Sequence, residues 1–517
     1  MASAKTKPAN LHKNQPAITH HNKEPLVDKK KFSYSFFAMM LLAIGSTVGV
    51  GIYYKTASLL ENTGGNLIVT YLAWFISIVA IIAICLCMGF LNKRNKYPEL
   101  SYIGYVRSEN NEGLFRGCKN FVLWVLIPVY NTCFGYYCVQ AIEESAKAFD
   151  SDFVMPFYAN ILIAFVIIIY FSTICVWPSL AEKHNRATSF LRAIPLLMCI
   201  IGGIIIFGVN FDHNNWTNHE AALDKLRRES NSLIHLTPFF GLIACFPAIL
   251  FAFDGFYFAA GSFVRMKNPQ KGPWAMAVGV IVVAVIYILV ATAILLGSIP
   301  NQDSRAVGSY QDLVVGDQRW VIGIMALFII FGMFGVTNGN ILFGVETFRL
   351  MYKDRRFFTF NFANNKEFVL FNYIYNIIYF IPITIFGIFY FEATSYGSDP
   401  INNSIWNVAD TLTNWCGTFS FLFLTIPIAG VLFNKSIKKN LRFKILGWIS
   451  VGFTSIVTLY LFVDVFYALS RILTKEYDDP KDRYQDIVSQ VITIVLFFFF
   501  AGVSFTPTLL KSKRRSA

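Results

Sequence analysis

The sequence predicts an all-α integral membrane protein with twelve membrane-spanning helices. Of its 517 residues, 55% are hydrophobic and only 15% are charged, whereas a soluble domain carries about 25% charged residues. The apolar residues occur in long blocks of the length that crosses a bilayer as a helix. Lysine and arginine are concentrated in every second connection between these blocks, as in a chain that crosses a membrane repeatedly.

The apolar blocks give the order of the helices. Only three charged side chains, Lys55, Asp254 and Asp464, fall inside them. No segment between the apolar blocks is long enough to bury a hydrophobic core of its own. We therefore expect one membrane domain over residues 36–510 and no enzymatic domain. The predicted spans are residues 36–60, 67–91, 121–142, 153–177, 193–211, 236–264, 274–299, 320–345, 368–391, 411–433, 445–470 and 487–510.

Both ends of the chain are polar. Residues 1–35 contain seven lysines and no apolar run of the kind found in signal peptides, so we expect a disordered tail that is not cleaved. Residues 511–517 form a basic tail suited to anionic lipid headgroups. With the N-terminus in the cytoplasm, inner segments hold 33 of the 44 basic residues. We therefore expect a multi-pass protein of the plasma membrane with both termini cytoplasmic.

Several classes of protein are disfavoured by the composition. The net charge of +13 is spread over the inner connections and not gathered on one face as in a nucleic-acid-binding protein. All seven histidines lie outside the predicted spans, and the chain has no paired Cys-x-x-Cys spacing and no phosphate-binding loop. We expect no catalytic residues, no metal, no cofactor, no nucleic acid and no obligate protein partner.

Glycine interrupts two of the predicted spans. Residues 45–51 read GSTVGVG in the first span, and residues 253–255 read FDG in the sixth. These spans are equivalent if residues 36–211 and 236–433 are two halves of five helices, with two further helices at residues 445–510. Paired interruptions at corresponding positions indicate a transporter binding site between inverted repeats.

A broken helix supplies what a zwitterion needs inside a membrane. The new N-terminus offers free N–H groups to a carboxylate, and the new C-terminus offers free carbonyls to an ammonium. Glycine lets the ligand approach the backbone closely. The alternative is that Gly45 and Gly49 are a pair of small residues that let two helices pack closely. The matching interruption at residues 253–255 in the sixth span favours the binding site.

The residues around the interruptions match a known pattern. Residues 45–52 (GSTVGVGI) are close to the motif GSxxGxGIF. Residues 251–256 (FAFDGF), followed by residues 267–273 (KNPQKGP), are close to a second motif with one residue missing before its last proline. Asn338-Gly339, and Trp124 with Asn131, are weaker matches. In these motifs the chain resembles the amino acid–polyamine–organocation superfamily of permeases.

The resemblance implies a LeuT-type fold, a five-plus-five inverted repeat followed by two helices. It implies that backbone N–H groups at positions 50 and 51 hold a substrate carboxylate and that carbonyls at 47, 251 and 254 hold the amine. Phe251 would cover the substrate as an aromatic gate. The implied substrate-binding residues are Thr47, Gly49, Val50, Gly51, Asn131, Phe251 and Asp254.

The carboxylates inside the spans have alternative interpretations. Asp254 either meets the substrate amine or caps local backbone donors. Asp464, near the outer end of the eleventh span, is expected to be solvated or to have a packing role. The superfamily often has a glutamate shortly before Lys-Asn-Pro, which this chain lacks. Tyr257 stands where some permeases for cationic substrates carry glutamate, which disfavours one type of arginine pocket.

The start of the fifth helix bears on ion coupling. Residues 192–195 (RAIP) correspond to a Lys-x-x-Pro setting in many sodium-independent members of the superfamily. The resemblance implies that Arg192 stands where sodium would bind, as a substitute for the cation. The alternative is that Arg192 anchors the helix at the inner interface.

The predicted function is secondary active or exchange transport of an amino acid by alternating access, independent of sodium. The partners are a small amino acid or amine substrate and the lipid bilayer. Two alternatives remain open: a polyamine or amine permease of the same fold, and an amino acid sensor without net transport.

Overall fold

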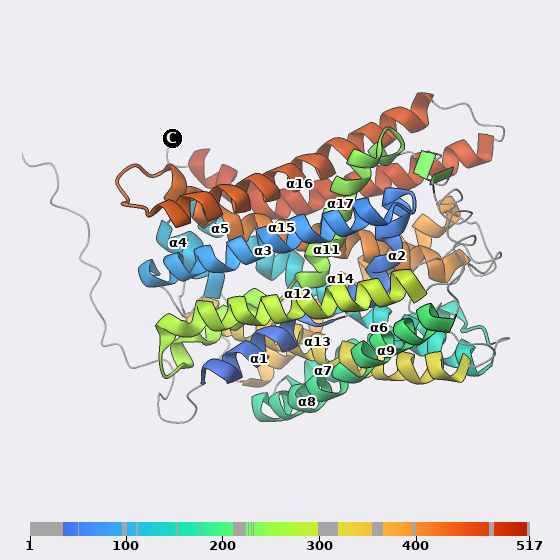
Figure 1. The fold of residues 1–517 in the computed structure, drawn as a ribbon, viewed down its shortest axis with the longest axis horizontal. Coiled ribbons are helices and arrows are strands. Elements are labelled where there is room, and N and C mark those ends of the chain that lie inside the picture. Colours follow the sequence, from blue (N-terminus) through green and yellow to red (C-terminus); the bar gives the residue numbers. More distant parts are fainter. Residues whose placement is uncertain are drawn as a thin grey trace, which may run out of the picture.

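The computed structural model is a bundle of long helices that run roughly along one axis of the molecule (Figure 1). Among the described residues the secondary structure is helical and contains no β-strand. The predicted all-α class is therefore confirmed. The structure describes residues 35–49, 51–95, 101–109, 112–150, 153–175, 177–209, 224–225, 227–228, 230, 232–297, 319–353, 365–394, 400–474 and 480–513.

The helices of the first half of the chain follow the predicted order. A π-helical turn, η2, joins α5 to α6 without interrupting the helix. The elements are α1 (Phe36–Thr47), α2 (Gly51–Thr63), α3 (Leu67–Arg94), α4 (Ser101–Glu109), α5 (Glu112–Phe121), η2 (Val122–Leu126), α6 (Ile127–Phe149), α7 (Phe157–Ile174), α8 (Pro178–Leu191) and α9 (Ala193–Val209).

The second half begins with a short turn and a second broken span. Long unbroken helices then follow to the end of the described chain. The elements are η3 (Leu233–His235), α11 (Pro238–Phe253), η4 (Phe256–Arg265), η5 (Pro269–Lys271), α12 (Gly272–Gly297), α13 (Arg319–Lys353), α14 (Asn365–Thr394), α15 (Pro400–Phe433), α16 (Leu441–Thr474) and α17 (Pro480–Lys513).

Most predicted spans coincide with helices that could cross a membrane. Within the described ranges nine helices are long and apolar enough, or ten if the bent pair α1–α2 is one span. Two shorter apolar helices, Ala193–Ile205 within α9 and Pro238–Phe253 (α11), cover the remaining predicted spans. Length and composition alone therefore mark nine or ten spans and not the predicted twelve.

One predicted boundary is wrong in a way that matters for the site. The tenth span was placed at residues 411–433, whereas α15 begins at Pro400 and includes Asp410. Asp410 lies directly before the predicted start, and a charge that finds a partner inside the protein does not end a helix. Asp410 is therefore a charged residue inside the helix of the tenth span, although it lies just outside the predicted span.

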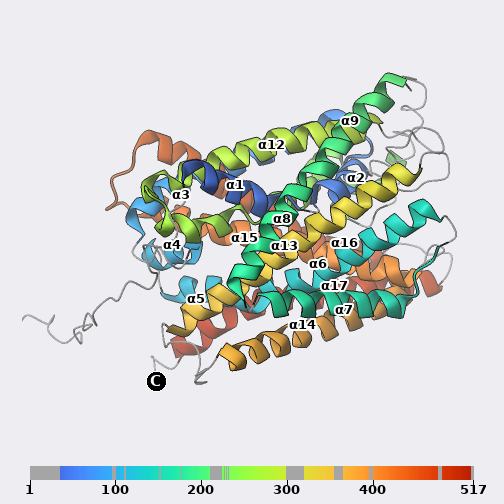
Figure 2. The same ribbon diagram turned by 90° about the horizontal axis from the view of Figure 1, so that it is seen from below.

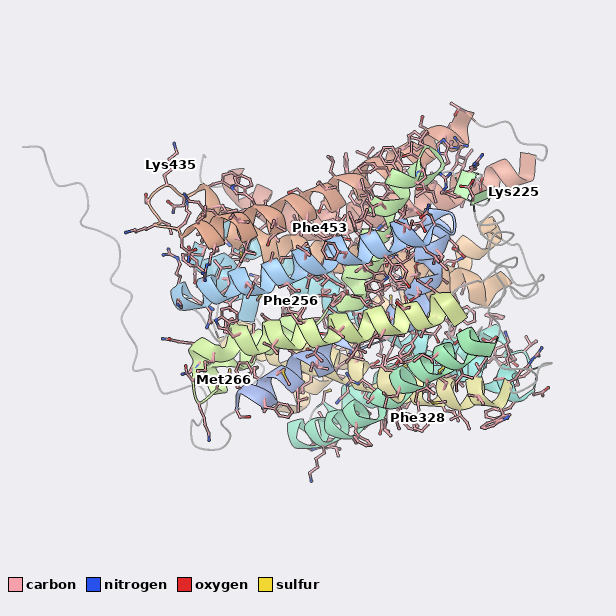
Figure 3. All side chains as sticks on the ribbon, viewed as in Figure 1. Lys225, Phe256, Met266, Phe328, Lys435 and Phe453 are labelled. Atoms are coloured by element: carbon pink, nitrogen blue, oxygen red, sulfur yellow. The ribbon has the colours of Figure 1, made fainter. Side chains whose placement is uncertain are left out.

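The connections at the two ends of the bundle are on opposite sides, as the predicted alternation requires. Lys435, between α15 and α16, and Met266, after η4, lie at one end, and Lys225 lies at the other (Figure 3). The start of α1 and the end of α17 lie at the same end as Lys435 (Figure 1). The two described ends of the chain are thus on one side of the bundle.

The broken spans lie in the interior of the bundle. Helix α1 packs along α12, and α11 packs against α2. Helix α13 passes between α6 and α8 and contacts both (Figure 2). The two interruptions are therefore surrounded by protein, which is where irregular backbone is tolerated at membrane depth.

The first span is interrupted after Thr47. The axes of α1 and α2 differ by 52° across the break. Val48 has extended backbone, with φ −69° and ψ 105°, and its N–H donates to the Ile44 carbonyl at 2.9 Å. The interruption predicted from glycine is present, while Val50 lies outside the described residues.

The sixth span is interrupted at Asp254 and Gly255. Asp254 is extended with ψ 150°, and Gly255 has φ +102°, a conformation that favours glycine. A Cβ at position 255 would overlap the carbonyl oxygen of Ser46 in α1. The turn that ends α11 therefore lies directly against the end of α1.

Gly255→Ala is expected to destabilise the protein by at least about 2 kcal/mol, because left-handed backbone costs roughly 1–2 kcal/mol in other residues and the overlap with Ser46 adds to it. The measurement is the thermal unfolding midpoint of the purified protein in detergent. Gly202→Ala in α9 is the matched control, since a Cβ there meets no atom within 4 Å. Equal thermal unfolding midpoints for Gly255→Ala and Gly202→Ala would contradict the inferred requirement for glycine at the turn beside Ser46.

Candidate functional site

The two interruptions touch through their backbones. A Cβ at Gly51 would lie 2.5 Å from the Cα of Ala252, so α2 and α11 cross at the closest distance that backbone permits. Any side chain at position 51 would separate them. Gly51 thus has a packing role, at the same place where the sequence predicts that a ligand meets the backbone.

A tyrosine of α12 joins the ends of the two half-helices. The Tyr287 hydroxyl lies 3.0 Å from the carbonyl oxygen of Thr47 and 3.1 Å from that of Ala252. Its ring packs against those of Phe253 and Trp74, with centroid separations of 5.2 and 6.3 Å. No local sequence pattern marks Tyr287, because its partners are remote along the chain.

Asp254 is buried in the break of the sixth span. Its carboxylate accepts a hydrogen bond from the Tyr130 hydroxyl of α6 and one from the Gly255 N–H at 3.0 Å. Of the two roles considered for Asp254, the contacts are those of a cap on a local backbone donor. Its predicted contact with a substrate amine remains a prediction.

Phe251 lies one turn before this break, inside an aromatic cluster. Its ring centroid is 6.0 Å from that of Tyr130, 6.4 Å from Phe134 and 6.3 Å from Tyr137. The Lys55 Nζ lies 4.9 Å from the same centroid, within the range of a cation–π contact. Phe251 is thus held between three rings of α6 and an ammonium group of α2.

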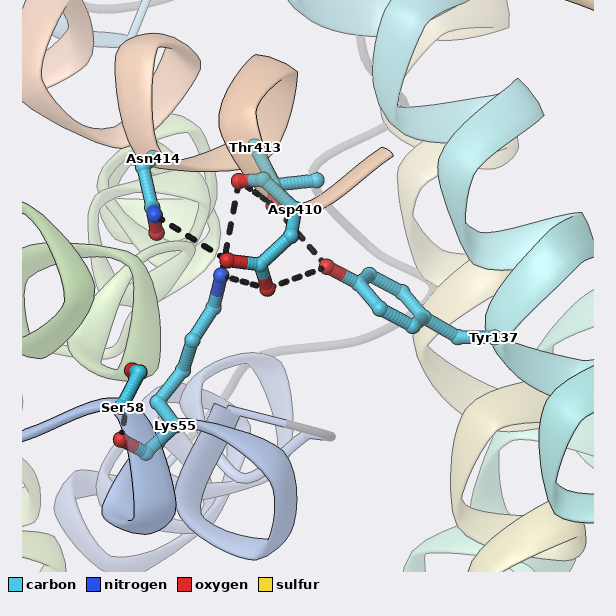
Figure 4. A network of polar contacts seen from close by, with 6 residues as sticks. All are labelled: Lys55, Ser58, Tyr137, Asp410, Thr413 and Asn414. Carbon is cyan, nitrogen blue, oxygen red and sulfur yellow. Dashed lines mark hydrogen bonds and ion pairs between the residues drawn. The ribbon is translucent and has the colours of Figure 1, made fainter. Parts of the chain in front are cut away.

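Lys55 takes part in a polar network that links three helices (Figure 4). Its ammonium forms an ion pair with Asp410 of α15. The Tyr137 hydroxyl lies 3.3 Å from Asp410 Oδ1, and the Asn414 amide donates to Oδ2 at 3.3 Å. Tyr137 also contacts Thr413 Oγ1 at 3.0 Å. The network thereby fixes α2 to α15 next to the aromatic cluster.

The two charges of this pair differ in exposure. The Lys55 side chain is 1% exposed, and that of Asp410 is 37% exposed. An ammonium at such depth requires a partner because desolvation of an isolated charge costs several kcal/mol. Asp410 supplies this partner and lies one residue before the predicted start of the tenth span.

Arg192 is buried between the first break and α13. Its guanidinium donates to the carbonyl oxygen of Gly45, and to that of Val48 at 3.3 Å. A Cβ at Gly335 of α13 would overlap the guanidinium, and one at Gly332 would lie 3.1 Å from its Cγ. These contacts place Arg192 inside the protein and not at the inner interface, the alternative raised from the sequence.

The remaining predicted site residues lie in different environments. The Thr47 hydroxyl donates to the Ala43 carbonyl at 2.7 Å, and a Cβ at Gly49 would lie 3.2 Å from Val336. Gly49 therefore faces α13. Val50 is outside the described part of the chain.

Asn131 faces α13 and α14. Its amide donates to Asn376 Oδ1 at 2.8 Å and accepts from Asn340 at 2.7 Å. Its neighbour Tyr130, and not Asn131, contacts Asp254. The predicted role of Asn131 in the substrate site remains a prediction, and Tyr130, which the sequence did not single out, is the residue of this helix that bonds Asp254.

Asp464 holds the connection before α11. Its Oδ1 accepts from the Ser232 hydroxyl and from the Leu233 N–H, both at 2.8 Å. This is the packing role expected for Asp464, and it lies apart from the two breaks.

Comparison with known proteins agrees with this architecture. The family model for amino acid permeases matches residues 34–509. An uncharacterized protein of Mycoplasma pneumoniae is 25% identical over 544 residues, covering 94% of this chain and 95% of that protein. Cationic amino acid transporter 4 of Mus musculus is 23% identical over 268 residues, covering 50% of this chain and 40% of that protein.

A solved structure supports the fold independently. The crystal structure of MhsT in complex with L-phenylalanine matches with a TM-score of 0.55 and 14% identity, over 84% of this chain and 99% of that one. The chain shares the LeuT-type fold of this structure, with its first span broken between α1 and α2. The chain belongs to the amino acid permease family, within the superfamily that its motifs resemble.

Asp410→Asn is expected to destabilise the protein by roughly 2 kcal/mol, because it leaves the Lys55 ammonium buried without a carboxylate. This loss of stability is smaller than the roughly 3–5 kcal/mol lost when one partner of a fully buried ion pair is removed, since Asp410 is partly exposed. The thermal unfolding midpoint in detergent measures it.

The matched control removes both charges at once. Lys55→Met combined with Asp410→Leu should recover most of the lost stability, because no charge is then buried unpaired. A double variant as unstable as Asp410→Asn alone would show that charge pairing is not what the network contributes.

Proposed function

We propose that this permease carries an amino acid across the plasma membrane by alternating access, as a secondary active or exchange transporter independent of sodium. The observation that carries the proposal is the contact between the two broken spans, where backbone ends of opposite polarity converge inside the bundle. Such ends match the two charged groups of a zwitterion. The names of two similar proteins point the same way: one is described as an amino acid transporter and one is bound to L-phenylalanine.

In the proposed complex the start of α2 holds the substrate carboxylate. Gly51 begins α2, so the N–H groups of its first turn have no partner within the helix. The superfamily motif adds the N–H of Val50 to this proposed carboxylate site. The ammonium faces the carbonyls of Thr47, Phe251 and Asp254. The ring of Phe251 covers the substrate from the aromatic cluster.

A ligand screen followed by uptake tests the function. The purified protein is heated with each of the twenty amino acids and with common polyamines, and a true ligand raises the unfolding midpoint by mass action. Proteoliposomes then report whether the stabilising compound accumulates. Stabilisation by polyamines alone would favour an amine permease, and binding without accumulation would favour a sensor.

We predict that removing sodium leaves transport unchanged. The buried guanidinium of Arg192, bonded to two carbonyls at the end of α1, supports this expectation. Arginine stays protonated, and a second cation at close range in a low dielectric is strongly excluded. Uptake into proteoliposomes is measured with sodium replaced by choline.

A fall in uptake of tenfold or more without sodium would contradict this prediction. Arg192→Lys serves as the matched variant, because it keeps a cation beside the same carbonyls. It should retain sodium-independent uptake, whereas Arg192→Ala should lose uptake because the two carbonyls are left without their donor.

We propose that both chain termini face the cytoplasm, from the excess of basic residues in the inner connections. Cysteines introduced at positions 5 and 515 should react with a membrane-impermeant maleimide only after cells are opened. A cysteine at Lys225, at the opposite end of the bundle, is the control and should react in intact cells. Labelling of position 5 or 515 from outside would overturn the orientation.

A further inference from the structure

The Tyr287 hydroxyl occupies a position that the proposed substrate contacts do not explain. It is fully buried, 3.0 Å from the carbonyl oxygen of Thr47 and 3.1 Å from that of Ala252. A phenol has a single proton to donate. One proton is therefore shared between two carbonyls that belong to different halves of the chain.

Both carbonyls lack the donor that a continuous helix would provide. Thr47 is the last residue of α1, and Ala252 lies in the last turn of α11, which ends at Phe253. The last four carbonyls of a helix have no partner within it. Left without a donor at this depth, each would carry a desolvation penalty.

The ring of Tyr287 is fixed in place. Phe253 and Trp74 pack against it, and these two rings also contact each other at 6.2 Å. The hydroxyl therefore cannot move without displacing the aromatic side chains around it. It holds the ends of α1 and α11 at a set separation.

We propose that Tyr287 is a positioning residue for the substrate's ammonium group. By holding the carbonyls of Thr47 and Ala252 in place, it presents to the site two acceptors that each retain a free lone pair. A primary ammonium has three N–H donors and can use both. This inference deepens the proposed function, on which it rests, and adds Ala252 to the groups that bind the amine.

The first experiment requires no ligand. Tyr287→Phe keeps the ring and removes only the hydroxyl, so we expect faster amide hydrogen exchange in peptides covering residues 46–52 and 252–256, measured by mass spectrometry in lipid nanodiscs. Tyr71→Phe is the matched control. Its hydroxyl also bonds a residue of α12, Thr292 at 3.1 Å, but lies away from both breaks, so exchange in these peptides should not change.

The second experiment separates ammonium binding from general damage. Dissociation constants are measured for L-leucine and for 4-methylpentanoic acid, which lacks the amino group, or for the equivalent pair of the amino acid selected by the ligand screen. The wild type should bind the amino acid at least tenfold more tightly. Tyr287→Phe should reduce this ratio at least fivefold, whereas Tyr71→Phe should preserve it.

The outcomes distinguish the inference from the function. Equal weakening of both ligands in Tyr287→Phe, or unchanged exchange at the two breaks, overturns the positioning role while the amino acid site stands. Failure of every amino acid to bind the wild type overturns the proposed function, and the exchange measurement still decides whether Tyr287 holds the two helix ends. If Tyr287→Phe does not fold, p-aminophenylalanine is introduced at position 287, because its amino group keeps N–H donors for the two carbonyls. This variant should show wild-type amide hydrogen exchange at both breaks and the wild-type ratio of the two dissociation constants.

Discussion

The structure depends on how polar backbone ends are satisfied inside a membrane-spanning bundle. Each broken span exposes N–H and carbonyl groups that a continuous helix would pair, and no bulk water reaches this depth to replace them. Three side chains supply partners: Arg192 for carbonyls near the end of α1, Tyr287 for one carbonyl of each half-helix, and Asp254 for the Gly255 N–H. Two of these side chains, Arg192 and Tyr287, come from other parts of the bundle, so the breaks depend on neighbouring helices for their partners.

The buried charges follow from the same constraint and are accommodated in different ways. Lys55 has a carboxylate partner, Arg192 has backbone carbonyls, and Asp254 has a tyrosine hydroxyl and an N–H group. Small neighbouring residues leave space for these charged groups. Gly335 in α13 leaves room for the guanidinium, where any larger residue would overlap it. The placement of these buried charges therefore depends on how the neighbouring helices pack.

The aromatic cluster around Phe251 is the part of the proposed site that should influence which substrate is preferred. Phe251 stands between the break of the sixth span and the pair formed by Lys55 and Asp410, and it contacts the ammonium of that pair. A change in the distance between α2 and α15 therefore acts on the ring that is proposed to cover the substrate. Substrate preference should depend on these residues, since the backbone ends are proposed to recognise only the groups that all amino acids share.

The sequence by itself determined the class of protein, the order of the helices and the places where two of them break, because hydropathy and glycine placement act locally. It also singled out Arg192, through a short motif, and the structure places this side chain beside the first break, while its role in ion coupling remains a proposal. Only the tertiary structure decided which side chains complete the site. Tyr287 bonds a residue 240 positions away and Lys55 pairs with Asp410 across 355 positions, and no local pattern encodes such contacts. The contact of Tyr130 with Asp254 shows the same limit, because the rotation of α6 that brings Tyr130 to the break is set by packing.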